Sequence, residues 1–160
     1  MSYSCDLQYS AGCWTEFSVL SSQGCVVSCS SINKPRKCVN SSDAFCYICG
    51  ELTFKSRRRS FTSLIKKCYG HYFGCKVGDQ DKNWAPHFCC VTCARRIAEW
   101  TKCSRCMPFA IPMVWRETAD HVSDCYFCLA SITGVTANSK HTAQYPNLQF
   151  SMRRVPQVRS

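Results

Sequence analysis

The chain has 160 residues and a mass of 18.2 kDa, which leaves room for one domain, or for one small domain with tails. Its charged fraction of 19% and hydrophobic fraction of 46% are ordinary, but sixteen cysteines exclude a fold held by an apolar core alone and favour a disulfide or metal scaffold. No run approaches the roughly 18 apolar residues of a membrane-spanning helix, and the net charge of +10 is compatible with nucleic-acid or acidic-protein partners without showing either.

The first residues bear on whether the cysteines form disulfides or bind metal. The start, Met1-Ser-Tyr-Ser-Cys-Asp6, has no positive region and is not followed by the apolar stretch of about 7–15 residues that a secretory signal contains. We therefore expect a reducing compartment, the nucleus or the cytoplasm, in which thiols persist and bind metal.

Three segments differ in composition and charge. Residues 1–44 hold eleven serines and five irregularly spaced cysteines with no net charge, which predicts a poorly ordered arm. Residues 45–128 carry a net charge of +6 and the regular motifs, and they are the predicted zinc-binding core. Residues 129–160 carry +4 with no acidic side chain, which predicts a basic, extended tail. A core this short buries a thin apolar layer, so a bound metal would be a strong stabiliser.

The clearest motif in the core is a pair of Cys-x2-Cys sequences. Cys46 and Cys49 form the first and, after forty intervening residues, Cys90 and Cys93 form the second. Two residues between cysteines make a tight turn, a knuckle, that directs both thiolates at one ion, and two knuckles complete a tetrahedron around zinc. Gly50 follows the first knuckle, where a left-handed turn lets backbone amides face the sulfurs. We predict a structural zinc site, because four protein ligands leave no position open for water.

Two helices are predicted around these motifs. Thr62 or Ser63 caps the first, in which apolar side chains recur every four residues until Gly74 ends it. The second runs from about Cys90 to Lys102, so its positive N-terminal end favours thiolate in the second knuckle. A knuckle in a hairpin and a knuckle at a helix start make the treble-clef arrangement. The predicted fold class is a small α+β zinc-stabilised domain, treble-clef-like, with few short strands and two helices.

Two stretches of the core are distinctive, Phe45-Cys-Tyr-Ile-Cys-Gly-Glu51 and Trp84-Ala-Pro-His-Phe-Cys-Cys-Val-Thr-Cys-Ala-Arg-Arg-Ile97. With the basic segment between them, residues 45–102 resemble the insect-type zinc-finger-associated domain, and the four knuckle cysteines match its zinc positions. The resemblance implies a treble-clef zinc module that mediates homodimerisation in nuclear regulatory proteins. More widely, residues 45–129 resemble uncharacterised cysteine-rich zinc proteins of invertebrate genomes, a likeness that implies no activity.

The segment Met107–Trp115 is apolar and contains two prolines, which predicts an extended edge segment packed on the core. Tyr69, Phe73 and Trp100 are expected on the outer faces of the two helices. They would form an apolar patch for self-association, unless the 107–115 segment folds back and covers it.

A second metal motif lies in residues 103–128. His121 and Cys125 are four residues apart, so one helical turn places both on one face. Cys128 completes a knuckle with Cys125 and supplies a third ligand. One zinc site is therefore predicted from the first pair of knuckles, and a second wherever these three residues find a fourth ligand.

The sequence leaves that fourth ligand open between two candidates. His141 follows Cys128 with twelve residues between them, the gap used in two-Cys, two-His fingers. Cys103 and Cys106 precede the motif with the spacing of a four-cysteine ribbon.

These observations predict a structural zinc-binding, protein–protein interaction module that self-associates. We expect no enzyme, because no base, nucleophile or open metal position is evident. The alternative is a nucleic-acid-binding zinc protein that uses the basic segment 55–67, which contains Arg57-Arg58-Arg59, and the C-terminal tail.

Overall fold

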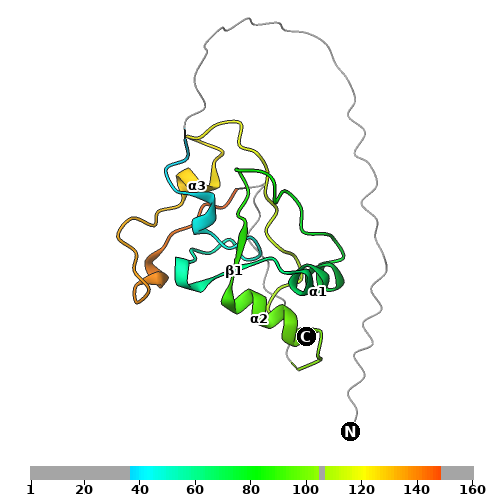
Figure 1. Cartoon of the computed structure of the whole chain (residues 1–160). Helices are drawn as coiled ribbons and strands as arrows, with labels where there is room; N and C mark the ends of the chain where they lie inside the picture. Colours follow the sequence, from blue (N-terminus) through cyan, green and yellow to red (C-terminus); the bar gives the residue numbers. More distant parts are fainter. Residues whose placement is uncertain (1–36, 105–106, 149–160) are drawn as a thin grey trace, which may run out of the picture. The chain divides into compact units, whose positions relative to one another are not determined.

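The computed structural model describes residues 37–104 and 107–148, and Figure 1 shows how its helices and strands are arranged. The first helix has the predicted ends. Helix α1 (Ser63–Phe73) begins after Thr62, whose side-chain oxygen accepts a hydrogen bond from the backbone N–H of Ile65. It ends at Gly74, where φ is +70°. Both predicted ends of the helix are confirmed. They could be predicted because an N-cap side chain and a left-handed glycine at the C-terminus each depend on a single residue type.

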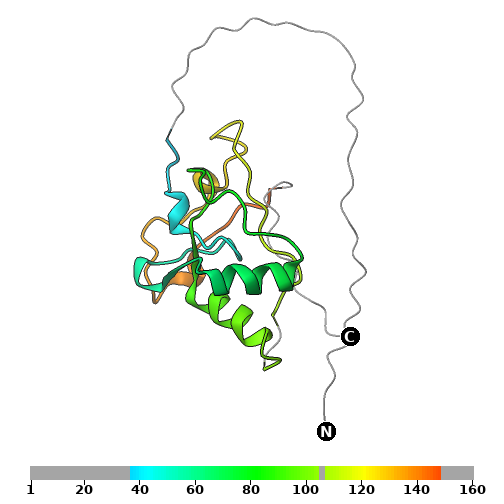
Figure 2. The same cartoon turned by 45° about the vertical axis from the view of Figure 1, so that its right-hand side comes forward.

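Helix α2 (Val91–Trp100) begins at the residue after Cys90, the first cysteine of the second knuckle. Its N-cap residue is Cys90, whose sulfur accepts a hydrogen bond from the backbone N–H of Cys93. The side chains of Cys93, Ala94 and Ile97 face inward and are buried. The two helices pack against each other, as Figure 2 shows.

A short antiparallel pair of strands leads into α2. Strand β1 (Arg58–Ser60) pairs with β2 (Phe88–Cys90), with Arg58 opposite Cys90. An isolated bridge between Phe45 and Leu52 closes the first knuckle. The remaining elements are one helical turn and three 3-10 turns: α3 (Tyr126–Leu129), η1 (Ser42–Ala44), η2 (Lys55–Arg57) and η3 (Lys140–Thr142). The architecture is thus a small α+β domain. Within residues 37–104 and 107–148, no helix is both long enough and apolar enough to span a membrane.

Aromatic side chains from distant segments fill the core between these elements. Phe45 packs against Tyr126 and Phe127, with ring centroids 5.7 and 5.3 Å apart. The apolar 107–115 segment is extended and packs on the core as predicted. Four of its side chains are buried: Met107, Phe109, Met113 and Trp115.

This segment also covers the helix faces on which an association patch was predicted. Tyr69 is buried rather than exposed. Phe73 stacks on Phe109 with an interplanar angle of 18°, and the hydroxyl of Tyr72 donates to the Phe109 carbonyl oxygen at 2.6 Å. The exposed patch predicted for Tyr69 and Phe73 is therefore not present. Residues 107–115 fold back and cover it, which was the alternative that the sequence left open.

Two short segments that composition assigned to the arm and to the tail contact the core in the structure. Residues 38–44 were assigned to the arm, yet Asn40 donates side-chain hydrogen bonds to the carbonyl oxygens of Phe127 and Ala130, at 2.6 and 3.0 Å. Residues 131–148 were assigned to the tail, yet the hydroxyl of Tyr145 accepts a hydrogen bond from the Leu52 N–H at 2.9 Å. Both segments join the core through contacts more than 80 residues apart in sequence, which composition does not report. The rest of the arm and of the tail lies outside the described residues.

Candidate metal centres

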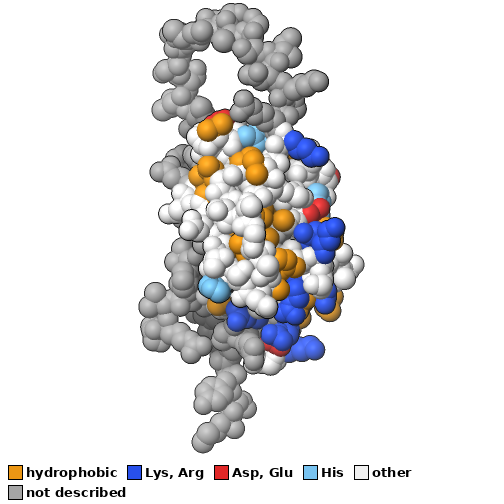
Figure 3. All heavy atoms as spheres, turned by 90° about the vertical axis from the view of Figure 1, so that its left-hand side faces the viewer, with side chains coloured by type: hydrophobic (Ala, Val, Ile, Leu, Met, Phe, Trp, Pro, Cys, Tyr) orange, Lys and Arg blue, Asp and Glu red, His pale blue; other side chains and the backbone are white. Residues whose placement is uncertain are grey.

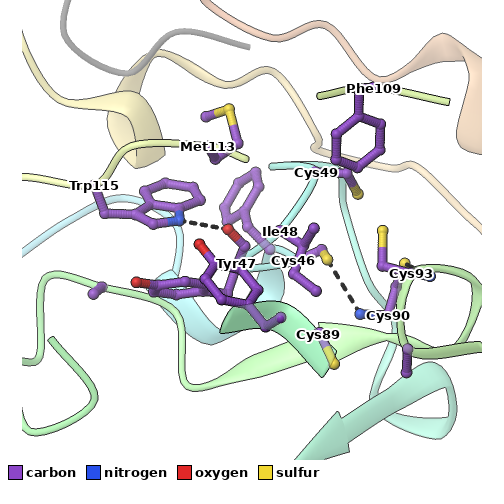
Figure 4. Packing of buried hydrophobic residues seen from close by; sticks show 14 of the residues in the cluster. Cys46, Tyr47, Ile48, Cys49, Cys89, Cys90, Cys93, Phe109, Met113 and Trp115 are labelled. Atoms are coloured by element: carbon purple, nitrogen blue, oxygen red, sulfur yellow. Dashed lines mark hydrogen bonds between the residues drawn. The ribbon is translucent and has the colours of Figure 1, made fainter. Parts of the chain in front are cut away.

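Four cysteine sulfurs meet at the junction of the first knuckle with the start of α2. Cys46, Cys49, Cys90 and Cys93 are all buried, and their sulfurs lie within 4.8 Å of one another. Figure 4 shows the four side chains directed toward a common space. This four-cysteine group is the set predicted from the two Cys-x2-Cys motifs.

Gly50 has the predicted left-handed φ, but its N–H faces a carbonyl oxygen rather than a sulfur. Its φ of +71° allows its N–H to donate to the carbonyl oxygen of Cys46 at 2.8 Å. The carbonyl oxygen of Glu51 accepts from the Cys46 N–H at 2.9 Å. A side chain at position 50 would also collide with Met113 and Tyr126, so the core reinforces the need for glycine.

Backbone amides support the sulfurs of this group. The N–H of Cys90 donates to the Cys46 sulfur at 3.2 Å, and the N–H of Cys93 donates to the Cys90 sulfur at 3.3 Å. The pKa of Cys90 is lowered, because its sulfur accepts hydrogen bonds from Cys46 and then from the other two thiols. The pKa values of Cys49 and Cys93 are raised, chiefly by their hydrogen bonds with Cys46. The contacts therefore favour thiolate at Cys90, and metal binding must release protons from Cys49 and Cys93.

Cys89 is adjacent to a ligand but is not one. Its sulfur points away from the four-cysteine group in Figure 4 and donates to the carbonyl oxygen of Arg59 at 3.5 Å. Burial, followed by the charge of Cys90, raises the pKa of Cys89 to about 12. Because neighbouring strand residues point to opposite faces, only Cys90 reaches the metal position, and Cys89 remains a buried thiol.

A second group contains the three ligands predicted from the downstream motif. Its members are Cys38, His121, Cys125 and Cys128, whose ligand atoms also lie within 4.8 Å of one another. Cys125 is buried and the other three are half-buried. We call this set the Cys3His group. It is the more accessible of the two.

The fourth member of the Cys3His group is Cys38, and neither downstream candidate joins the group. His141 lies in η3, where it is exposed and lines a small surface pocket with Glu51 and Tyr145. Cys103 is exposed outside both groups, and Cys106 falls outside the described residues. Spacing rules identify ligands that are close in sequence, and Cys38 lies 83 residues before His121. The sequence indicated that a fourth ligand was needed for His121, Cys125 and Cys128, but no spacing rule pointed to Cys38.

A polar loop presents His121 to this group. The Asp120 carboxylate accepts hydrogen bonds from the N–H and hydroxyl of Ser123, at 2.8 and 2.6 Å. Arg116 and Asp124 form an ion pair of 2.5 Å across the loop, and the hydrogen bond from Arg116 lowers the pKa of Asp124. The N–H of Val39 donates to the Cys128 sulfur at 3.4 Å. These contacts order the loop on both sides of His121, whose own ring contacts the sulfurs of Cys38 and Cys128.

The distances in the Cys3His group fit tetrahedral zinc. With Zn–S near 2.3 Å and Zn–N near 2.0–2.1 Å, a tetrahedron has S···S edges of about 3.8 Å and S···N edges of about 3.6 Å. The Cys38 and Cys125 sulfurs are 3.7 Å apart. His121 Nδ1 lies 3.5 Å from the Cys38 sulfur and 3.4 Å from the Cys128 sulfur. Soft thiolate ligands with one imidazole suit zinc among the common metals.

No protein-family model matches this chain, and no curated protein or solved structure shows significant similarity to it. The resemblance to the zinc-finger-associated domain therefore stays a prediction. The assignment of two candidate metal centres depends on their own geometry.

Proposed function

We propose that this chain is a structural zinc-binding domain of the treble-clef type, which holds two zinc ions and serves as a self-associating interaction module. The observation that carries the proposal is the presence of two complete four-ligand sets, both with ligand atoms within 4.8 Å. A complete set of protein ligands leaves no position for water or substrate, as is usual for zinc that stabilises a fold. The zinc would replace apolar burial that a domain of this size lacks.

The interaction role is supported by apolar side chains around the Cys3His group. Val39, Val122 and Leu129 are 79%, 66% and 39% exposed, and each directly follows a ligand of this group in sequence. Metal ligation would fix all three on one local surface, as a preformed contact. This surface replaces the helix faces that residues 107–109 cover.

Native mass spectrometry of the full chain tests the proposal, because it counts zinc ions and subunits at once. We expect two zinc ions per chain and a dimer at micromolar concentration. Val122→Glu should shift the dimer to monomer and keep two zinc ions. Leu64→Glu is the matched control, since Leu64 is 64% exposed on α1 and should leave the dimer intact. A monomer with two zinc ions would contradict self-association only, whereas a folded chain without zinc would contradict the whole proposal.

A further inference from the structure

A pocket of about 530 Å³ opens beside the four-cysteine group. Its walls come from three separate parts of the chain: the segment around η2, the first turns of α2, and the loop before η3. Its volume lies in the range of small-ligand sites, about 300–1,000 Å³. Three basic side chains line it, Arg57, Arg96 and Lys140, against one acidic side chain, Glu51.

Two of these cations have no anionic partner in the described part of the chain. Lys140 pairs with Glu51 at 3.3 Å, so those two charges offset each other. Neither Arg57 nor Arg96 forms an ion pair within residues 37–104 and 107–148. The pocket therefore presents two guanidinium groups that form no ion pair within the described residues, and such groups are well suited to bind phosphate oxygens in a bidentate manner.

The neighbouring arginines of the basic segment are engaged elsewhere. Arg58 Nε donates to the carbonyl oxygen of Thr53 at 3.1 Å, and Arg59 Nη1 donates to that of Arg58 at 2.8 Å. Neither side chain lines the pocket. Of the three consecutive arginines, only Arg57 contributes to this site. Figure 3 shows Lys and Arg side chains gathered along one edge and the lower end of one face, with few acidic side chains among them.

An aromatic ring also lines the pocket without belonging to the core. Phe54 is half-buried, and it is neither part of the buried aromatic cluster nor packed against another aromatic ring in the described part of the chain. Every other described phenylalanine except Phe88 belongs to the core or packs on it. A ring of this kind beside unpaired arginines is the combination that binds single-stranded nucleic acid, because bases stack on the ring and phosphates pair with the cations.

The zinc-bearing wall lowers the net charge of the pocket, but none of its sulfurs forms a hydrogen bond with Arg57 or Arg96 in the described part of the chain. Zinc with four thiolates carries a formal charge of −2, and Lys140 and the N–H groups at the start of α2 lie next to those sulfurs. The first-turn amide of Cys93 is already bound to the Cys90 sulfur, so the start of the helix offers little to a ligand. The anion site consists of side chains, chiefly those of the two unpaired arginines.

We propose that this pocket binds single-stranded nucleic acid, with a backbone phosphate held between Arg57 and Arg96 and a base stacked on Phe54. The site is separate from the apolar surface around the Cys3His group. The pocket leaves the structural role of zinc unchanged and gives the domain a second kind of partner, a single-stranded nucleic acid.

Fluorescence anisotropy with a labelled ten-nucleotide single strand tests the proposal on the full zinc-loaded chain. We expect binding that weakens with salt, with a slope of about −0.7 per phosphate neutralised. The double variant R57A/R96A should lose at least about tenfold in affinity and flatten the slope by roughly 1.4, the contribution of two phosphate contacts. Phe54→Ala should lose about tenfold, as expected for one stacked base, with the slope unchanged.

The matched control is R59A/R95A, which removes the same charge from two exposed arginines outside the pocket. Its affinity should stay within about threefold of the parent chain, because neither side chain lines the pocket and exposed charges that make no direct contact are weakened by salt. Equal losses in both double variants would overturn the site and indicate non-specific attraction. So would the absence of binding at about 100 µM protein, the weak end of non-specific affinities.

Two further measurements distinguish this proposal from a site for free anions and from a general loss of the fold. Inorganic phosphate that competes as well as the oligonucleotide would overturn the role of Phe54 and indicate a free-anion site. Native mass spectrometry of every variant should give two zinc ions, so that a loss of binding is not a loss of fold. A variant chain that keeps both zinc ions and loses the strand supports the pocket independently of whether the protein self-associates.

Discussion

The indole N–H of Trp115 donates a hydrogen bond of 2.8 Å to the carbonyl oxygen of Tyr47, which lies between the two cysteines of the first knuckle. The same indole stacks on Phe127 at an interplanar angle of 11°. Phe127 lies between the two cysteines of the downstream knuckle. One side chain thus connects the two metal-binding turns, and their positions are not independent.

Trp115→Phe should therefore destabilise the domain without removing a ligand. It leaves the buried carbonyl oxygen of Tyr47 without this donor, at an expected cost of about 1–3 kcal/mol. Chemical denaturation with zinc in excess, followed by circular dichroism, measures the change. Trp84→Phe is the control, because Trp84 is only half-buried and its indole has no hydrogen bond in the described structure. Equal effects of the two variants would contradict the connecting role of Trp115.

Gly50→Ala tests the first knuckle. A Cβ at this position would lie 2.9 Å from the Met113 Cε and 3.0 Å from the Tyr126 hydroxyl, in addition to the strain of a φ of +71°. Gly134 has nearly the same φ, +72°, but a Cβ there would meet no described atom within 4 Å, so Gly134→Ala reports backbone strain alone. We expect about 1 kcal/mol for Gly134→Ala and about 1–3 kcal/mol more for Gly50→Ala, measured by denaturant midpoints. Identical values would show that the core yields to the added methyl group.

Adjacent cysteines provide a sharp test of the ligand assignment. Cys90→Ala should reduce the zinc content from two ions to one and unfold α2 with the surrounding core, since metal binding in such sites is folding free energy. Cys89→Ala should keep both ions, because its sulfur faces the other side of β2. Native mass spectrometry and circular dichroism distinguish the variants. Loss of one ion in both would contradict the assignment of Cys90 as the ligand and Cys89 as a thiol outside the site.

Acidification should release zinc in two steps, with the Cys3His group first. Burial raises the pKa of Cys125 to about 12 and raises that of Cys38 as well. The pKa values of Cys49 and Cys93 in the four-cysteine group are also raised, chiefly by hydrogen bonds with Cys46, so protons compete with zinc in both groups as the pH falls. Three of the four ligands of the Cys3His group are half-buried, whereas all four cysteines of the other group are buried, so protons reach the Cys3His group first. A zinc-responsive dye should show two steps in the parent chain and only the later one in Cys38→Ala.

Features that depend on neighbours in sequence were predicted from the sequence. The ends of α1 follow from a capping threonine and a left-handed glycine, and the four-cysteine group follows from two knuckles that each aim two sulfurs. The features missed are those that depend on tertiary contacts. Cys38 finds His121 across most of the folded unit, and Phe109 covers Phe73 because the intervening chain returns over α1. Local patterns show which side chains are apolar, but not which distant segment will cover them.

The two metal groups close one loop of chain inside another. The four-cysteine group joins residues 46–49 to 90–93, and the Cys3His group joins residue 38, which precedes this loop, to residues 121–128, which follow it. On a ribosome, the inner loop has all its ligands once residue 93 has emerged, while the outer loop waits for residue 128. During that interval the thiol of Cys38 has no partner from its own group. The order of assembly is thus set by the chain, from the inside outward. A nascent chain arrested before His121 has emerged would leave Cys38 without the other ligands of its group and open to oxidants or to a competing metal.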